Sequence, residues 1–384
     1  MKIFLSFLQG KPGHPIPAYG FWEYYIKNGI VESGHSWLEL QDVDWAYGLV
    51  PKSKESQEQW MDNAWKKTIA FLKRNKVDLF LSYLYPSQID IDSIEEIKKL
   101  GIPVVNFFCD NIREFKKTPI QFKAFDLNWV PEYKALEMYK KARAAYIHLP
   151  MPMWVEPKYR SLPKLEMPKV SFIGSNDIQR QLLFEKAIAL DLNFELNIYG
   201  TAWQDGSHRS ESSAMPLLGL KSKLFNQFEY INKHGALNWY RKLKQRNINI
   251  PISVDLKKAI KGKPSFEDYI QITKASYVTL GVNRYPSYAF PLHKPDTYSR
   301  LRDIEAPMLG ACYLTEWTEG IDKMYVIGTE IETYKTAEEL VDKAKRLVRD
   351  KITRDNLRAQ GQQKALSDFT ISNSIAQIQK HLSI

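Results

Sequence analysis

A chain of 384 residues is too long for one small domain and long enough for two, each with its own hydrophobic core. Its hydrophobic fraction of 44% and charged fraction of 26% exclude a disordered chain and are typical of a globular protein. The net charge of +10 suits an anionic ligand, an acidic surface or nucleic acid, and does not choose among them.

The cysteines and the apolar runs indicate a cytoplasmic protein. Cys109 and Cys312 lie far apart without metal-type spacing, which argues against a disulfide framework and a zinc site and favours a reducing cytosol. The apolar run from Ile3 to Leu8 is too short for a signal peptide, and we interpret it as the first buried strand. No run approaches the roughly 18 apolar residues that a membrane span requires.

The first part of the chain alternates short apolar strands with helical stretches. We expect strands at 2–8, 35–40, 77–84, 102–109, 125–130 and 145–149, and helices at 19–32, 55–75, 91–100 and 133–142. Such alternation is typical of an α/β fold, in which helices cover a parallel sheet and ligands bind at the carboxyl ends of the strands. The pattern predicts a Rossmann-like domain over residues 1–160.

The second part repeats this alternation after a proline-rich connection at 150–168. We expect strands at 170–173, 194–199, 277–282 and 311–314, and helices at 179–190, 266–273, 301–309 and from Thr336 to about Arg349, where Thr336 and Glu339 form a capping box. Residues 203–262 are interpreted as an insertion that covers a site or binds a partner. We therefore predict a second Rossmann-like domain at 161–370, followed by a helix at 371–384 that packs back on the first domain.

Small and polar residues gather where the predicted strands end. The candidates are His14, Asp110, Gly174, Ser175, Gly200, Asn283, Arg284 and Thr315, together with Arg300, Arg302 and Glu305 near the helix at 301–309. A guanidinium binds phosphate in a forked geometry, and a carboxylate accepts hydrogen bonds from the hydroxyls of a ribose or sugar. A cleft lined by these groups would suit a diphosphate ligand.

Simpler structural explanations stand beside these functional ones. Arg302 and Glu305 have the spacing of an ordinary ion pair on a helix surface. Asp110 has the position of a helix cap, and His14 lies in a Gly/Pro turn. Walker A, G-x-S-x-G, H-E-x-x-H and a complete G-x-G-x-x-G motif are absent. The most basic aromatic stretch, 221–246, fits a solvated amphipathic helix as well as a nucleic-acid site, and we predict no nucleic-acid partner.

The second part resembles the nucleotide-binding domain of group 1 glycosyltransferases, in particular the CgeB-like spore-maturation glycosyltransferases. The resemblance rests on GVNRYP at 281–286, RLRDIEAPMLGACYLTEWTE at 300–319 and RDNLRAQGQQKALSDFT at 354–370, and more loosely on VVNFFCDN at 104–111. It implies a GT-B architecture of two Rossmann-like domains facing across a cleft, with the acceptor in the first domain and a nucleotide-sugar donor in the second. On matching positions, Glu305 is implied to bind ribose or sugar hydroxyls, and Arg284 and Arg302 to neutralise the diphosphate without a metal or cofactor.

We therefore expect a cytoplasmic, metal-independent glycosyltransferase of the hexosyltransferase type. Its donor would be a nucleotide diphosphate sugar, and its acceptor a glycan, a lipid-linked molecule or a protein. Many retaining members carry a glutamate where Thr297 stands; the retaining outcome is slightly favoured, and an inverting route with His14 or Asp110 as base stays open. The alternatives are a non-catalytic nucleotide-, glycan- or partner-binding protein and a basic protein that associates peripherally with a membrane or binds nucleic acid.

Overall fold

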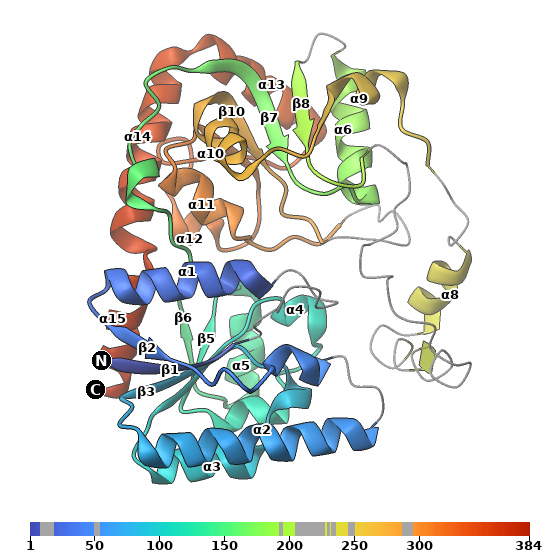
Figure 1. Ribbon diagram of the computed structural model, residues 1–384. Coiled ribbons are helices and arrows are strands. Elements are labelled where there is room, and N and C mark those ends of the chain that lie inside the picture. The colour runs from blue at the N-terminus through green and yellow to red at the C-terminus, as the bar shows by residue number, and fades with distance from the viewer. Residues whose placement is uncertain are drawn as a thin grey trace. The chain divides into compact units, whose positions relative to one another are not determined.

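The structure is a computed structural model that describes residues 1–7, 19–49, 54–191, 195–203, 227–228, 231, 236–244, 250–285 and 295–384. The described residues divide into two compact units, Met1–Trp154 with Ser367–Ile384 and Val155–Leu366 (Figure 1). His14 and most of the predicted insertion lie outside the described residues. Within the described part of the chain, no helix is long and apolar enough to cross a membrane.

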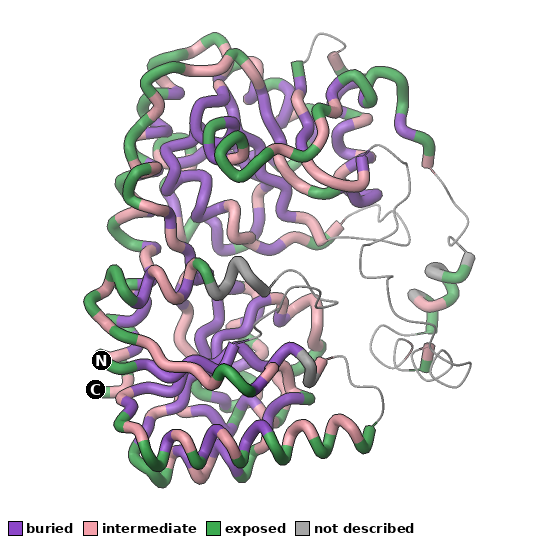
Figure 2. Tube along the Cα trace, in the orientation of Figure 1, coloured by how far each residue is buried: buried purple, intermediate pink, exposed green. Residues whose placement is uncertain are grey.

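The first unit is built on a six-stranded parallel sheet in the order β2-β1-β3-β4-β5-β6. Its strands are β1 (Lys2–Ser6), β2 (Ser36–Leu38), β3 (Leu79–Ser82), β4 (Val104–Phe107), β5 (Leu127–Val130) and β6 (Tyr146–His148). All six were predicted, and each is shorter than predicted. Every residue of β3, β4 and β5 is buried (Figure 2), as expected for parallel strands covered on both faces.

The last helix of the chain belongs to this first unit. The helices here are α1 (Tyr19–Glu32), α2 (Lys54–Arg74), α3 (Ile91–Lys99), α4 (Asn111–Glu114), α5 (Leu136–Ala142) and α15 (Ile371–Leu382). Helix α15 packs on α1 so closely that a Cβ added to Gly29 would overlap the side chain of Ile371. Thr370 caps α15 by accepting a hydrogen bond from the N–H of Asn373. Packing on α1 therefore anchors the last helix in the first unit.

The second unit contains another six-stranded parallel sheet, in the order β12-β11-β10-β7-β8-β9. Its strands are β7 (Met167–Ile173), β8 (Leu196–Tyr199), β9 (Ile260–Gly262), β10 (Ser276–Gly281), β11 (Tyr313–Glu316) and β12 (Glu332–Tyr334). The strand order reverses between β7 and β10, which lie side by side. Ligands of such sheets bind outside the carboxyl ends of the strands at this switch point.

The helices of the second unit are α6 (Ile178–Leu190), α8 (Ala236–Lys244), α9 (Val254–Ala259), α10 (Phe266–Ala275), α11 (Arg302–Met308), α12 (Ile321–Met324), α13 (Ala337–Arg349) and α14 (Lys351–Asp368). Most of them lie between these strands in the chain, and α13 and α14 follow the last strand. Thr336 caps α13 through the N–H of Glu339, as predicted. The Glu339 carboxylate, however, accepts from the N–H of Lys335 at 2.9 Å and not from that of Thr336. The segment 203–262 contributes α9 and β9, so its last part belongs to the sheet and its covering.

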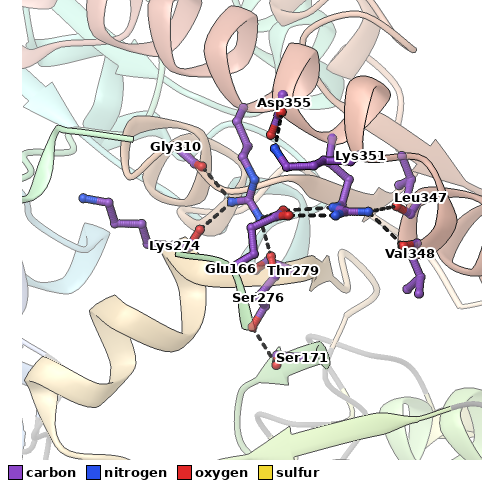
Figure 3. A network of polar contacts seen from close by, with 12 residues as sticks. Glu166, Ser171, Lys274, Ser276, Thr279, Gly310, Leu347, Val348, Lys351 and Asp355 are labelled. Carbon is purple, nitrogen blue, oxygen red and sulfur yellow. Dashed lines mark hydrogen bonds and ion pairs between the residues drawn. The ribbon is translucent and has the colours of Figure 1, made fainter. Parts of the chain in front are cut away.

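Helix α14 was not predicted, because half of the residues that it buries are polar or charged. Arg354, Arg358 and Gln362 are 3%, 2% and 9% exposed, and they replace the apolar residues that reveal a helical period in a sequence. Glu166 accepts hydrogen bonds from Arg354 at 2.9 and 2.7 Å, and Arg358 donates to the carbonyl of Gly310 at 3.1 Å (Figure 3). These bonds join α14 to the residues just before β7 and β11, at the amino edge of the sheet.

Candidate functional site at the carboxyl edge of the second sheet

Most of the predicted site residues lie at the carboxyl ends of strands in the second unit. Gly174 and Ser175 follow β7, Gly200 follows β8, and Asn283 and Arg284 come just after β10. Because all strands of this sheet are parallel, these ends share one edge. The edge contains the switch point between β7 and β10, and the candidate site is built there.

The turns after β7 and β8 approach each other too closely to allow a side chain. Gly200 has φ +140°, and a Cβ added to it would overlap the backbone of Gly174. The Gly174 carbonyl also accepts a hydrogen bond from the indole of Trp203 at 2.8 Å, and the N–H of Asn176 donates to the carbonyl of Thr201 at 2.9 Å. The two predicted glycines thus set the path of the backbone at the switch point.

Helix α6 begins at this edge directly after the β7 turn. Its cap residue Asp177 accepts hydrogen bonds from the N–H groups of Gln179 at 2.8 Å and Arg180 at 3.2 Å. The Asp177 carboxylate lies 3.3 Å from Arg180 Nε, and Arg180 Nη1 donates to the carbonyl of Ser175 at 2.8 Å. A helix amino end attracts anions, but here the protein's own carboxylate already occupies part of it.

A fully buried carboxylate organises the segment between β10 and α11. Asp303 accepts hydrogen bonds from the side chains of Asn283, Ser299 and Tyr313 at 2.9 Å and of Thr315 at 2.8 Å. Burial raises the pKa of the Asp303 carboxyl above its ordinary value, and these hydrogen bonds oppose the increase. The predicted residues Asn283 and Thr315 are therefore committed to this network through their side chains.

Arg284 is held by a carboxylate at the end of β11. Its Nε lies 3.1 Å from both oxygens of Glu316, its Nη2 also donates to that carboxylate, and its Nη1 donates to the carbonyl of Gln179 at 3.1 Å. The side chains of Arg284 and Glu316 are 11% and 5% exposed. The arginine therefore joins β10, β11 and α6, and Glu316 balances its charge.

Arg302 and Glu305 come together on the first turn of α11. Arg302 Nε lies 3.8 Å from Glu305 Oε2. The alternative of an ordinary surface pair is wrong for Glu305, which is 4% exposed. Tyr269 of α10 donates its hydroxyl hydrogen to Glu305, and its ring centre lies 4.7 Å from the Arg302 guanidinium. Arg302 Nη2 is 3.5 Å from the carbonyl oxygen of Ile173, the last residue of β7, which places this group at the switch point.

Arg300 has different contacts from Arg302. It lies two residues before α11, its Nη2 donates to the Tyr298 hydroxyl at 2.9 Å, and its guanidinium lies 4.8 Å from the centre of the Tyr298 ring. Its backbone N–H donates to Asp303 at 3.0 Å. Arg300 is thus tied to the segment before α11 through both its side chain and its backbone.

Asp110 belongs to the first unit, close to the carboxyl end of β4. Its φ of +66° is uncommon for a residue other than glycine, and such strain gathers at functional sites. The alternative that its side chain caps the next helix is wrong, because Asp110 makes no side-chain capping hydrogen bond. Glu132, just after β5, instead accepts from the N–H of Asn111 at 2.7 Å. The Asp110 carboxylate lies 3.7 Å from Arg113 Nη1.

Glu132 is a buried acid beside Asp110. It is 1% exposed, and among the described residues its Oε1 has no hydrogen-bond partner. Burial raises the pKa of Glu132 to about 8; the hydrogen bonds from Asn111 lower it, and the charge of Asp110 raises it. The first unit therefore holds a buried carboxyl with a strongly raised pKa next to its candidate base.

Sequence reasoning missed Tyr269, Asp303, Glu316 and Glu132. Asp303 and Glu316 lie within the motif at 300–319, but no spacing distinguishes a buried carboxylate from an exposed one. Tyr269 and Glu132 reach their partners only through the tertiary fold. Asp177 had a usable signal, since an acidic residue directly before a predicted helix indicates a cap.

Comparisons with known proteins agree with this architecture. A sucrose-phosphate synthase from Thermosynechococcus elongatus has a TM-score of 0.59 at 11% sequence identity, with 99% of this chain and 98% of that chain covered. HepE of Anabaena, solved in complex with UDP, has a TM-score of 0.58 at 12% identity, with both chains fully covered. A glycosyltransferase from Rickettsia africae has a TM-score of 0.54 at 12% identity, with 99% and 97% covered. The predicted GT-B fold of two Rossmann-like units is confirmed.

Sequence comparisons place the chain in a family. No curated protein matches it. The family model described as glycosyl transferase-like matches residues 179–380, more than half of the chain. The match includes α6, the loop after β10, and the α11 motif with Arg302 and Glu305. This protein therefore belongs to the glycosyl transferase-like family.

Proposed function

We propose that this protein is a glycosyltransferase that binds a nucleoside diphosphate sugar at the carboxyl edge of its second sheet. The observation that carries the proposal is the pairing of Arg302 with the buried Glu305 at the switch point, 3.5 Å from the end of β7. A guanidinium there suits a diphosphate, and a carboxylate suits the hydroxyls of a ribose. Family membership supports glycosyl transfer as the general activity.

Within this proposal, Arg302 is the main cation for the leaving nucleoside diphosphate. Arg284 was predicted for the same role, but Glu316 holds it in a buried pair, and Asp177 holds Arg180 in a similar way. Arg302 is 26% exposed and keeps a longer distance to its carboxylate, which leaves it better placed to meet a ligand. Preorganised positive charge of this kind stabilises negative charge that develops as the glycosidic bond breaks.

In the proposed complex Glu305 binds the hydroxyls of the ribose. A uridine diphosphate sugar is the first donor to test. HepE of Anabaena was solved with UDP and with UDP-glucose, and that choice is carried to this chain as part of the proposal. We further propose that the reaction needs no metal, that the donor carries a hexose, and that the protein is cytoplasmic. We also propose that the protein is a member of the CgeB-like group and that its acceptor is a glycan, a lipid-linked molecule or a protein.

The base of the inverting version of the reaction is Asp110 or His14, of which the structure describes Asp110. The left-handed backbone and partly exposed carboxylate of Asp110 support this role. The retaining version, which we keep as the slightly favoured prediction, needs no such base. Asp110→Asn and His14→Asn separate the two versions: in the inverting reaction one of these variants would lose most of the rate, whereas in the retaining reaction both would keep it.

Calorimetric binding against UDP, GDP, ADP and CMP, and against their sugars, tests the proposal. Wild type should bind one nucleotide class, and Glu305→Ala should weaken that binding. Glu319→Ala, an exposed carboxylate in the loop after β11, is the matched control and should bind as wild type does. Donor turnover, followed with and without EDTA, then tests catalysis and metal independence. Binding without turnover would support the non-catalytic alternative, and no binding by the folded protein would contradict the proposal.

A further inference from the structure

Tyr269 is held firmly at the candidate donor site by its own helix. It lies on α10, which begins at the Ser265 cap and leads directly into β10. Ile270 and Thr273, on the same helix, are 3% and 0% exposed and fix α10 in the core. The Phe266 ring lies 6.3 Å from that of Tyr269, centre to centre. The direction of the Tyr269 side chain is therefore set by packing and not by a mobile loop.

The hydroxyl of Tyr269 orients the Glu305 carboxylate. It donates its hydrogen to Glu305 Oε2, and Glu305 is 4% exposed. Burial raises the pKa of the Tyr269 phenol well above its usual range, although the charge of Arg302 acts in the opposite direction, so the hydroxyl stays a donor at neutral pH. A hydrogen bond to an ionised acceptor is among the stronger ones in proteins.

The ring of Tyr269 supports Arg302. The guanidinium carbon lies 4.7 Å from the ring centre, a typical cation–π distance. In this position Arg302 Nε is directed to Glu305 at 3.8 Å and Nη2 to the carbonyl of Ile173 at 3.5 Å. The flat ring thus restricts a long side chain that would otherwise sample many conformations before a ligand arrives.

We propose that Tyr269 is a positioning residue of the donor site, whose hydroxyl sets Glu305 for the ribose and whose ring sets Arg302 for the diphosphate. The inference rests on the proposed function and extends it to a residue outside the resembling motifs. Substitution can separate the role of the hydroxyl from the role of the ring. Tyr269→Phe removes the hydroxyl and keeps the ring, whereas Tyr269→Leu removes both.

Binding of a nucleoside diphosphate and of its 2′,3′-dideoxy analogue separates these effects. Wild type should prefer the ribonucleotide. Tyr269→Phe should lower affinity for the ribonucleotide by about 3- to 10-fold, the effect of one weakened polar contact, and leave affinity for the dideoxy analogue unchanged. Tyr269→Leu should weaken both ligands, because Arg302 loses its support. Phe266→Leu, which removes the neighbouring ring on α10, should keep the ribose preference.

The outcomes distinguish this inference from the function on which it rests. If folded wild type binds no nucleotide, the proposed function fails. If wild type binds without a ribose preference, or Tyr269→Phe keeps wild-type affinity and preference, the positioning role is overturned while nucleotide binding stands. A merely structural role would lower the melting temperature of Tyr269→Phe and weaken both ligands equally. Should Tyr269→Leu fail to fold, the comparison of Tyr269→Phe with wild type decides alone.

Discussion

Replacing Glu132 with glutamine should change how the stability of the first unit depends on pH. In the folded chain the pKa of Glu132 is about 8, against an ordinary value of 4.5. Between these pH values the unfolded chain releases the proton and the folded chain keeps it. The folded state then binds more protons, so the free energy of unfolding falls as the pH rises through this window. Below the window both states are protonated, and above it no further loss occurs.

The size of this effect follows from the difference between the two pKa values. Each tenfold change in proton affinity corresponds to about 1.4 kcal/mol, so the full window corresponds to about 5 kcal/mol. Glutamine has nearly the same shape, keeps an oxygen that can accept from Asn111, and does not titrate. Glu132→Gln should therefore lack the loss of stability that wild type suffers between pH 5 and pH 8.

Urea unfolding at pH 5 and pH 8 measures this difference, with fluorescence of the buried Trp65 and Trp129 as the signal of the first unit. His148, whose pKa burial lowers, contributes its own pH dependence to both proteins and cancels in the comparison. Glu137→Gln is the control, because Glu137 is 60% exposed in its pair with Lys141; it should follow wild type. Identical pH dependence of wild type and Glu132→Gln would refute the reasoning.

Three further predictions concern the second unit. Arg358→Met should lower the free energy of unfolding by about 3–5 kcal/mol, because it removes the side-chain donor of the carbonyls of Lys274, Ser276 and Gly310 and one of the two arginine partners of Glu166. Chemical denaturation should show at most about 1 kcal/mol for the exposed control Lys351→Ala. Glu316→Gln should lower the free energy of unfolding by about 3 kcal/mol, because it breaks the buried ion pair with Arg284. A melting temperature unchanged from wild type would contradict this expectation. Gly200→Ala should destabilise by about 2–4 kcal/mol in denaturation, since it adds a clash at positive φ, and an unaltered midpoint would show that the turn tolerates a side chain.

The predictability of the fold depended on where apolar residues are buried. Strands covered on both faces, such as β3 and β4, appear as apolar runs that the sequence reveals directly. Strands β9 and β12 were not predicted, because their sequences, IKG and ETY, contain charged or polar residues in place of an apolar run. Helix α14 was not predicted because its buried residues include Arg354 and Arg358, which bind Glu166 and Ser276 far away in the chain.

The candidate site was predictable in its position and only partly in its contacts. Arg302 and Glu305 were predicted as site residues from their position near a strand end and from the family resemblance. The structure places both at the switch point. The sequence could not show that Arg284 is neutralised by Glu316, because 32 residues separate them and many acidic residues were equally eligible partners. Such pairings arise from strand order and register, which local patterns do not encode.

A crystal structure of the protein with the nucleoside diphosphate that it binds best would show directly where the donor lies. We expect the diphosphate within hydrogen-bonding distance of Arg302 and the ribose hydroxyls on Glu305, at the carboxyl edge of the second sheet. A hollow near the amino end of β7 is lined by Lys169, Lys345 and Arg349 together with Asp191 and Glu195. Nucleotide bound in that hollow, with no contact to Arg302 or Glu305, would contradict the proposed donor site.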